Sequence, residues 1–292
     1  MLKGVQEVIH GGFVFDADIS ASAHEKQTKL IVLIRSMRSV LAAFSGGVDS
    51  TFLLKTVVDV LGAKAGAITA TSPTYPEHEF EAAKRLAVQI GARHIIVESN
   101  ELEIPNFADN TDKRCYYCKS ELFKISFEQA ASLGFETVVD GSNADDAMDY
   151  RPGKAAAVEL GVRSPLLDVG LTKDEIRFLS RELGLPTWNK PSAACLSSRF
   201  PYGTAITEER LGKVGKAEDL LRSLGFYQFR VRYHNDVARI EADLISMRSF
   251  LDEAVREKVV DGFKKIGFIY VTLDLQGFRS GSMNEALKAK GG

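Results

Sequence analysis

The chain has 292 residues, and its 45% apolar and 26% charged residues are typical of a globular protein rather than a disordered or fibrous one. Its 37 basic and 39 acidic residues nearly balance, so no overall positive field favours a nucleic-acid partner. No apolar run approaches the roughly 18 residues that cross a bilayer, and three cysteines, an odd number, argue against a disulfide framework. We therefore expect a cytoplasmic protein without a membrane or nucleic-acid partner.

Strand-like and helix-like segments alternate after an N-terminal tail, 1–26, which lacks the layout of a signal peptide. The expected strands are 39–44, 67–70, 94–99 and 137–141, and the expected helices are 53–61, 77–90, 116–133 and 172–184. Thr172 and Glu175 form a capping box that marks the start of the last helix. Strands that are apolar throughout indicate a parallel sheet covered on both faces, so we predict a doubly wound, Rossmann-like α/β domain over 27–190.

A different pattern follows the predicted junction loop, 191–204, which contains Cys195. We expect a helix at 207–224, two adjacent strands at 227–234 and 237–242, a long helical stretch at 246–266 and a last strand at 268–275. These elements predict a smaller C-terminal α+β domain over 205–286, for substrate binding or oligomerisation.

A glycine-rich turn, "SGGVDS", ends the first expected strand at residues 45–50. Ligands of open parallel sheets bind beyond the carboxyl ends of the strands, where backbone N–H groups and a helix N-terminus attract anions. Gly46 and Gly47 allow a close approach, the hydroxyls of Ser45 and Ser50 add donors, and Asp49 is a candidate magnesium ligand. The turn has no lysine that would reach a phosphate, and the simpler interpretation is an ordinary strand-to-helix turn.

A second polar segment, "DGSNADD", follows the strand expected at 137–141. Alone it is consistent with an Asx-rich turn, but it follows a strand of the same sheet. Together, the two segments resemble the signatures of the ATP pyrophosphatases, or PP-loop proteins, which cleave ATP between its α and β phosphates and adenylate a substrate. The resemblance implies a pyrophosphate cradle in "SGGVDS", nucleotide contacts at Gly141 and Asn143, and Asp145 and Asp146 near the metal or phosphates.

The three cysteines form a pair, Cys115 and Cys118, and a distant member, Cys195. The Cys-x-x-Cys pair lies at the start of an expected helix, where thiolates are stabilised. A redox dithiol, half of a zinc site and part of an iron–sulfur site all fit this spacing, and a zinc site would need a further ligand such as His234. Cys195 alone is consistent with a small buried side chain.

Four further segments resemble the LarE-type sulfur transferases, which make the nickel-pincer nucleotide cofactor of lactate racemase. They are "DYRPG" (149–153), "WNKPSAACLSSRFPYGT" (188–204), "RVRYHNDVARIE" (230–241) and "YVTLDLQGFRSGSMN" (270–284), and the resemblance spans about 28–285. Some members sacrifice the sulfur of a single cysteine, whereas others hold a [4Fe–4S] cluster with three. This sequence has the second pattern, which implies a cluster at Cys115, Cys118 and Cys195 that carries sulfur from sulfide or another donor.

The resemblance also implies the substrate, pyridinium-3,5-biscarboxylic acid mononucleotide, which derives from nicotinate. ATP with Mg²⁺ would convert each carboxylate to an acyl-adenylate, and sulfur would displace AMP to leave a thiocarboxylate. The substrate carries a phosphate, and Arg230 and Arg232 alternate along one strand, so both project from the same face. Arg199 is a further candidate for the phosphate, while the alternative for all three is a solvated charged face. The resemblance further implies a homo-oligomer.

Three rival functions remain open at this point. A tRNA 2-thiolation enzyme of the same superfamily would need many basic contacts to RNA, which the balanced charge does not favour. An amidotransferase-like synthetase would leave the three cysteines without a role. A nucleotide- or metal-binding regulator without turnover would not need Asp49 or the carboxylates of "DGSNADD".

Overall fold

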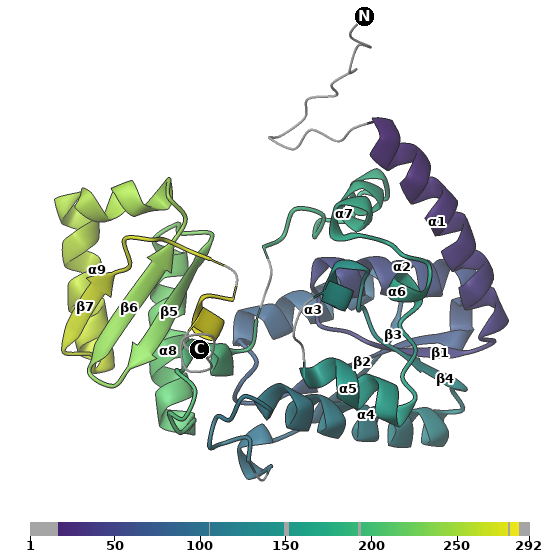
Figure 1. Cartoon of the computed structure of the whole chain (residues 1–292), viewed down its shortest axis with the longest axis horizontal. Helices are drawn as coiled ribbons and strands as arrows, with labels where there is room; N and C mark the ends of the chain where they lie inside the picture. Colours follow the sequence, from purple (N-terminus) through teal and green to yellow (C-terminus); the bar gives the residue numbers. More distant parts are fainter. Residues whose placement is uncertain (1–16, 105, 149–151, 192–193, 280, 286–292) are drawn as a thin grey trace, which may run out of the picture. The chain divides into compact units, whose positions relative to one another are not determined.

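The computed structural model describes residues 17–104, 106–148, 152–191, 194–279 and 281–285, which form two compact units (Figure 1). Among the described residues, the first unit contains 17–71, 77–99, 115–148 and 152–191, and the second contains 72–76, 100–104, 106–114, 194–279 and 281–285. Two internal segments that the sequence analysis included in the first domain, 72–76 and 100–114, are thus grouped with the second unit. None of the described helices combines the length and apolarity needed to cross a bilayer.

The first unit is built on a four-stranded parallel sheet in the order β3-β2-β1-β4. Its strands are β1 (Val40–Ala43), β2 (Ala65–Thr71), β3 (Arg93–Glu98) and β4 (Thr137–Val139). Strand β1 is central, because Val40 lies opposite Ala65 of β2 on one side and Thr137 of β4 on the other. The strand order therefore reverses beside β1, and the predicted α/β fold class is confirmed.

Helices cover both faces of this sheet (Figure 1). Val40 and Ala42 belong to one apolar core with α1, α2, α3 and α7, whereas Leu41 belongs to a second core with α4 and α5. Neighbouring strand residues point to opposite faces, so these two cores lie on the two sides of the sheet. The helices are α1 (Ala17–Ser36), α2 (Val48–Leu61), α3 (Glu77–Ile90), α4 (Arg114–Leu133), α5 (Pro152–Leu160), α6 (Pro165–Asp168) and α7 (Lys173–Glu182), with 3-10 turns η1 (Gly62–Lys64), η2 (Glu101–Glu103) and η3 (Asp145–Met148).

Two sequence expectations concern the ends of these helices. Helix α1 begins at Ala17, inside the segment that the sequence analysis treated as a tail, and its Ala23 and Leu30 are completely buried in the core. The expected capping box is confirmed at the start of α7. The Thr172 side chain accepts a hydrogen bond from the Glu175 amide, and the Glu175 side chain accepts one from the Thr172 amide.

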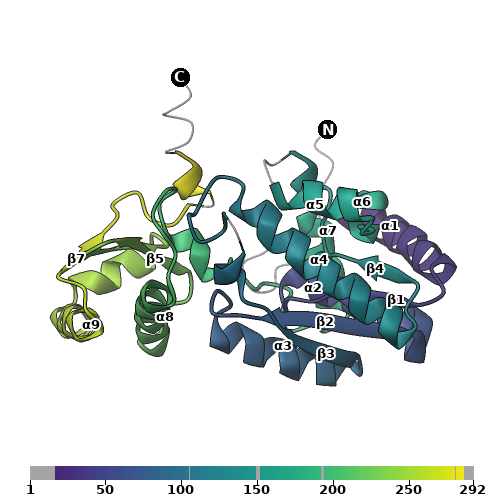
Figure 2. The ribbon, with the colours of Figure 1, turned by 90° about the horizontal axis from the view of Figure 1, so that it is seen from below.

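The second unit contains a three-stranded sheet in the order β5-β6-β7 (Figure 1), and Figure 2 shows the same unit from below. Strands β5 (Phe229–His234) and β6 (Val237–Ala242) form the expected antiparallel hairpin, and β7 (Tyr270–Leu273) is parallel to β6. The hairpin turns at Asn235, whose φ of 55° is tolerated by asparagine. Helices α8 (Glu208–Ser223) and α9 (Glu253–Ile266) pack with this sheet, and short turns η4 (Leu196–Arg199), η5 (Ser246–Leu251) and η6 (Ser282–Asn284) complete the unit.

The helical stretch expected at 246–266 is divided into two elements. Turn η5 ends at Leu251, and Asp252 caps a separate helix, α9, by accepting a hydrogen bond from the Val255 amide at 3.0 Å. Aspartate in extended backbone is a strong N-cap because its side chain satisfies an amide of the first turn. Asp252 was therefore the signal for a break that the apolar spacing concealed.

Candidate functional site

The "SGGVDS" turn joins β1 to the N-terminus of α2, as the sequence predicts. Gly46 has a φ of 64°, and a Cβ at this position would lie 3.1 Å from the Cβ of Ala83, so both the backbone and the available space require glycine. The hydroxyls of Ser45 and Ser50 lie 3.1 Å apart across the turn. The loop thus brings two hydroxyls and the positive end of a helix to one place, which suits a polyphosphate.

The second motif lies against this turn. A Cβ on Gly141 would lie only 3.0 Å from the Ser50 amide nitrogen, so the two segments approach at backbone distance. Asn143 is almost completely buried and donates from Nδ2 to Oδ1 of Asp49 at 3.2 Å. Its Oδ1 accepts the amide of Asp145 at 2.9 Å, which fixes the orientation of the side chain. The structure therefore brings the two predicted nucleotide motifs together.

Two lysines that sequence reasoning missed also reach this site. The ammonium of Lys173, the first residue of α7, lies 2.5 Å from Oδ2 of Asp49, and its backbone amide donates to Asp145 at 2.7 Å. Lys190 donates to the carbonyl of Gly46 at 3.0 Å and to Glu79 at 2.6 Å. The cations absent from the turn itself come from distant segments. The capping box before Lys173 was the one signal in the sequence that could have located the first of them.

The carboxylates also fit a magnesium ion. Mg²⁺ prefers oxygen ligands, often one or two carboxylates together with substrate phosphates. Asp49 accepts from the Lys173 ammonium and Asp145 from the Lys173 backbone amide, so both carboxylates lie beside the start of α7. Lys173 would thus neutralise Asp49 when the metal and the nucleotide are absent.

Glu79, on α3, provides a pH-dependent prediction for this site. Burial raises its pKa, but hydrogen bonds from His78 and Lys190 outweigh burial and lower the pKa of Glu79 from 4.5 to about 2. A lowered folded-state pKa stabilises the protein above pH 4.5, and this stabilisation is lost as the pH falls toward 2. We expect wild type to lose about 2 kcal/mol more unfolding free energy than Glu79→Gln between pH 6 and pH 3.

Urea unfolding at several pH values measures this difference. Glu81→Gln is the matched control, because Glu81 lies on the same helix in a half-exposed pair with Lys84. If the unfolding free energies of wild type and Glu79→Gln changed equally with pH, the ion pair between Glu79 and Lys190 would be contradicted.

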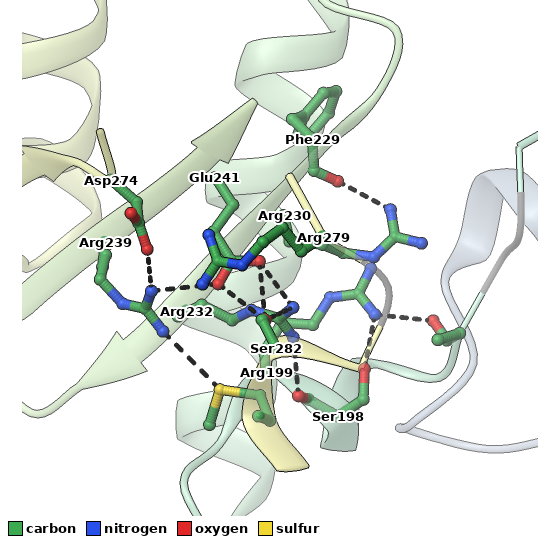
Figure 3. A network of polar contacts seen from close by, with 12 residues as sticks. Ser198, Arg199, Phe229, Arg230, Arg232, Arg239, Glu241, Asp274, Arg279 and Ser282 are labelled. Carbon is green, nitrogen blue, oxygen red and sulfur yellow. Dashed lines mark hydrogen bonds and ion pairs between the residues drawn. The ribbon is translucent and has the colours of Figure 1, made fainter. Parts of the chain in front are cut away.

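Five arginines of the second unit form a polar network around Glu241 and Asp274 (Figure 3), and one of them, Arg199, also pairs with Glu218. Arg232 is buried and donates to Glu241 at 2.6 Å, to the Ser282 hydroxyl at 2.8 Å and to the Ser198 carbonyl at 2.9 Å. Arg230, two residues earlier, donates to the Phe229 carbonyl. The network is completed by Arg199, Arg239 and Arg279.

Two arginines of this network, Arg230 and Arg232, have lowered pKa values. Burial, together with the charge of Arg199, lowers the pKa of Arg230 to about 10. Burial likewise lowers the pKa of Arg232, although Glu241 opposes the shift. Guanidinium groups held this close favour the binding of an anion, which would offset their repulsion.

Arg199 has a more specific set of contacts. Its Nε and Nη2 donate to both oxygens of the buried Glu218 at 2.8 and 2.9 Å, and its Nη1 donates to the carbonyls of Ala194 and Cys195 at 2.9 and 3.1 Å. Most of its donors are therefore engaged within the protein. These contacts hold the backbone that carries Cys195, and a role of Arg199 in binding phosphate stays a prediction.

The cysteines belong to both units. Cys115, which is exposed, and Cys118, which is part-buried, lie in the first turn of α4, while Cys195 is part-buried at the start of η4 in the second unit. All three carry thiols rather than a disulfide. Among the described residues, no three His, Cys, Asp or Glu side chains come together as a metal site, and the convergence of the three thiols stays a prediction. Residues 149–151 of the "DYRPG" segment lie outside the described part of the chain.

Comparison with known proteins places these features in a family. No family model matches the chain. An uncharacterised protein of Synechocystis is 49% identical over 247 residues, which cover 85% of this chain and 92% of that protein. The B subunit of the GMP synthase of Thermoplasma volcanium is 29% identical over 201 residues, 63% of this chain and 61% of the subunit.

The most informative relative is the pyridinium-3,5-bisthiocarboxylic acid mononucleotide synthase of Lactiplantibacillus plantarum. It is 41% identical over 268 residues, which cover 91% of this chain and 96% of the synthase. Such identity over nearly the whole of both chains agrees with the motifs of the glycine turn, the cysteine segments and the arginine strand. This chain belongs to the family of the pyridinium-3,5-bisthiocarboxylic acid mononucleotide synthases, the LarE-type sulfur transferases.

Proposed function

We propose that this protein is an ATP-dependent sulfur transferase that converts the two carboxylates of pyridinium-3,5-biscarboxylic acid mononucleotide to thiocarboxylates. One observation carries the proposal: Asp49, Asn143 and Lys173, from three distant segments, meet at a phosphate-binding turn in a member of this family. The same arrangement serves the adenylation of a carboxylate, which is a poor electrophile until it is activated.

The chain's own residues support the first half of the reaction. A substrate carboxylate oxygen attacks the α-phosphorus of ATP, the bond to the β-phosphate oxygen breaks, and pyrophosphate leaves. Backbone N–H groups at the start of α2 and the ammonium groups of Lys173 and Lys190 would stabilise the charge on the leaving pyrophosphate. Asp49 and Asp145 would hold Mg²⁺, which would neutralise charge on the phosphates.

In the second half, sulfide attacks the acyl carbon, the bond to the AMP oxygen breaks, and a thiocarboxylate forms. Cys115, Cys118 and Cys195 would hold a [4Fe–4S] cluster, which supplies an iron with an open position for the transferred sulfur. The thiols of the three residues and the engagement of the Cys195 backbone by Arg199 support this assignment. The arginine network would bind the substrate phosphate.

Pyrophosphate release with different acceptors tests the proposed function. Anaerobically purified protein is given ATP, Mg²⁺ and either the mononucleotide, unmodified tRNA or ammonium with a carboxylate acceptor. We expect release with the mononucleotide. Release with tRNA would support the rival thiolation enzyme, and no release with any acceptor would support a regulator without turnover.

The substrate-binding role of the arginine network gives a second prediction. Removing a guanidinium–phosphate contact should raise the Kd of the mononucleotide about 10-fold or more and leave the Kd of ATP unchanged. Arg230→Ala is preferred to Arg232→Ala, because loss of Arg232 would leave the fully buried Glu241 without this ion pair and destabilise the fold. Binding of both ligands is measured by calorimetry.

The matched control is Arg248→Ala, since Arg248 is exposed on η5 of the same unit. Equal losses of ATP and mononucleotide affinity in Arg230→Ala would instead assign β5 to the nucleotide site.

Two further expectations concern the self-association of the protein and its cellular compartment. Apolar side chains exposed in the second unit, among them Ile245, Leu251, Tyr270 and Leu275, support self-association into a homo-oligomer. Three thiols without a disulfide agree with a reducing compartment such as the cytoplasm.

A further inference from the structure

Glu175, the third residue of α7, accepts more hydrogen bonds than its capping box requires. The box needs one bond from the N-cap amide, which Oε2 of Glu175 accepts from Thr172 at 2.8 Å. Helix α1, which packs against α7 (Figure 1), adds two further donors. Ser22 donates to Oε1 at 2.6 Å, and the Lys26 ammonium donates to both oxygens at 2.7 and 2.8 Å. Both oxygens of this carboxylate are therefore bonded to α1.

The ion pair between Lys26 and Glu175 is largely shielded from water. Only 25% of the Lys26 side chain and 6% of the Glu175 side chain are exposed. Desolvation offsets much of the attraction in such a pair, so we expect its main effect to be on the position of the two helices. A second pair between the same helices, His24 with Glu182, is about half exposed and is a weaker constraint.

The start of α7 is also bonded directly to the nucleotide site. Lys173, its first residue, donates from its backbone amide to Asp145 at 2.7 Å, and its ammonium contacts Asp49. Glu175 is one half-turn further along the same helix, where it binds α1. Contacts within the first unit thus run from α1 through the first turn of α7 to the two carboxylates beside the glycine turn.

We propose that Lys26 and Glu175 are positioning residues for adenylation, which hold the first turn of α7 so that the Lys173 ammonium meets the pyrophosphate that leaves ATP. This inference rests on the proposed function, in which Lys173 stabilises that leaving group. A charge that stabilises a transition state is most effective when it is already in place, and a displacement of about 1 Å can cost up to about 100-fold in rate. Helix α1 thus contributes to catalysis without contacting a substrate.

The double variant Lys26→Met, Glu175→Gln removes the ion pair. Glutamine still completes the capping box, and neither substitution leaves a buried charge without its partner, so this variant should fold. We expect kcat for mononucleotide-dependent pyrophosphate release to fall about 10-fold and KM for ATP to change by less than about 2-fold. The matched control is Lys29→Met with Glu25→Gln, an exposed pair on the same helix, which should leave both constants unchanged.

Combination with Lys173→Gln separates positioning from a general effect on the fold. If the ion pair acts through Lys173, its removal should change kcat by less than about 2-fold in the Lys173→Gln background. Losses that multiply would overturn the inference. Glu182→Gln, which removes the exposed pair between the same two helices, should keep the wild-type rate. A loss as large as that of the double variant would assign the effect to helix packing in general.

Hydrogen–deuterium exchange without nucleotide tests the position of α7 independently of activity. The amide of Lys173 should exchange about 10-fold faster in the double variant than in wild type, as measured on peptides that cover 171–176. Ser22→Ala, which leaves the ion pair intact, should give a smaller increase and serves if the double variant fails to fold. Exchange that neither change accelerates would overturn the inference.

The outcomes also distinguish this inference from the proposed function. A wild-type rate of pyrophosphate release in Lys173→Gln would overturn the inference, because the ion pair would then have no lysine to act through. The absence of mononucleotide-dependent pyrophosphate release in wild type would count against the proposed function. In that case the exchange measurement still decides whether Lys26 and Glu175 fix the start of α7.

Discussion

Replacing Asp49 with asparagine should lower substrate-dependent pyrophosphate release by at least about 100-fold while the protein remains folded. Asparagine preserves the shape of the side chain and can still pair with Asn143. It removes the negative charge that lies 2.5 Å from the ammonium of Lys173 and that would bind Mg²⁺. The loss should therefore appear in the chemical step rather than in stability.

A coupled assay for pyrophosphate measures this effect, and circular dichroism checks the fold. Asp59→Asn is the matched control, because Asp59 lies further along α2 in an exposed pair with Lys55. Release at the wild-type rate in Asp49→Asn would show that the glycine turn does not bind the reacting nucleotide in the proposed way.

Serine at Cys115, Cys118 or Cys195 should abolish iron binding and sulfur transfer together. Serine has nearly the same size as cysteine but is a poor ligand for iron, and a cluster with three protein ligands cannot tolerate the loss of one. Formation of the acyl-adenylate should persist in all three variants, since the nucleotide site of the first unit contains none of these residues.

Iron and acid-labile sulfide in anaerobically purified protein are measured together with the product and with pyrophosphate. If only Cys195→Ser stopped sulfur transfer, Cys195 would be a sacrificial sulfur donor and the Cys-x-x-Cys pair would need another role. Equal loss of pyrophosphate release in the three variants would contradict the separation of adenylation from sulfur transfer.

The first half of the nucleotide site could be predicted from the sequence because its residues follow strands of one parallel sheet. Asp49 comes after β1 and Asn143 after β4, and adjacent parallel strands bring their carboxyl ends to the same edge. Lys173 could not be predicted in the same way, because it lies 124 positions after Asp49 and approaches from a helix N-terminus. Its place depends on how α7 packs against α2 and not on a local pattern.

In the second unit, too, some features could be predicted from the sequence and others could not. Alternation along β5 indicated that Arg230 and Arg232 project together, but the carboxylate that engages Arg232 comes from the neighbouring strand through the hairpin register. The contribution of residues 100–114 could not be predicted either, because the bonds of Asn110 to residues 200–203 are made to backbone carbonyls. Every residue has a backbone carbonyl, so such bonds do not show in the side-chain types of the partner residues.

The central claim, that this protein replaces carboxylate oxygen by sulfur on a mononucleotide, is tested most directly by identifying the product. Anaerobic protein is incubated with pyridinium-3,5-biscarboxylic acid mononucleotide, ATP, Mg²⁺ and sulfide, and the small molecules are analysed by mass spectrometry. We predict that the bisthiocarboxylate appears together with AMP and pyrophosphate, and that Asp49→Asn yields none of the three. A carboxamide, or unchanged mononucleotide despite consumption of ATP, would contradict the claim.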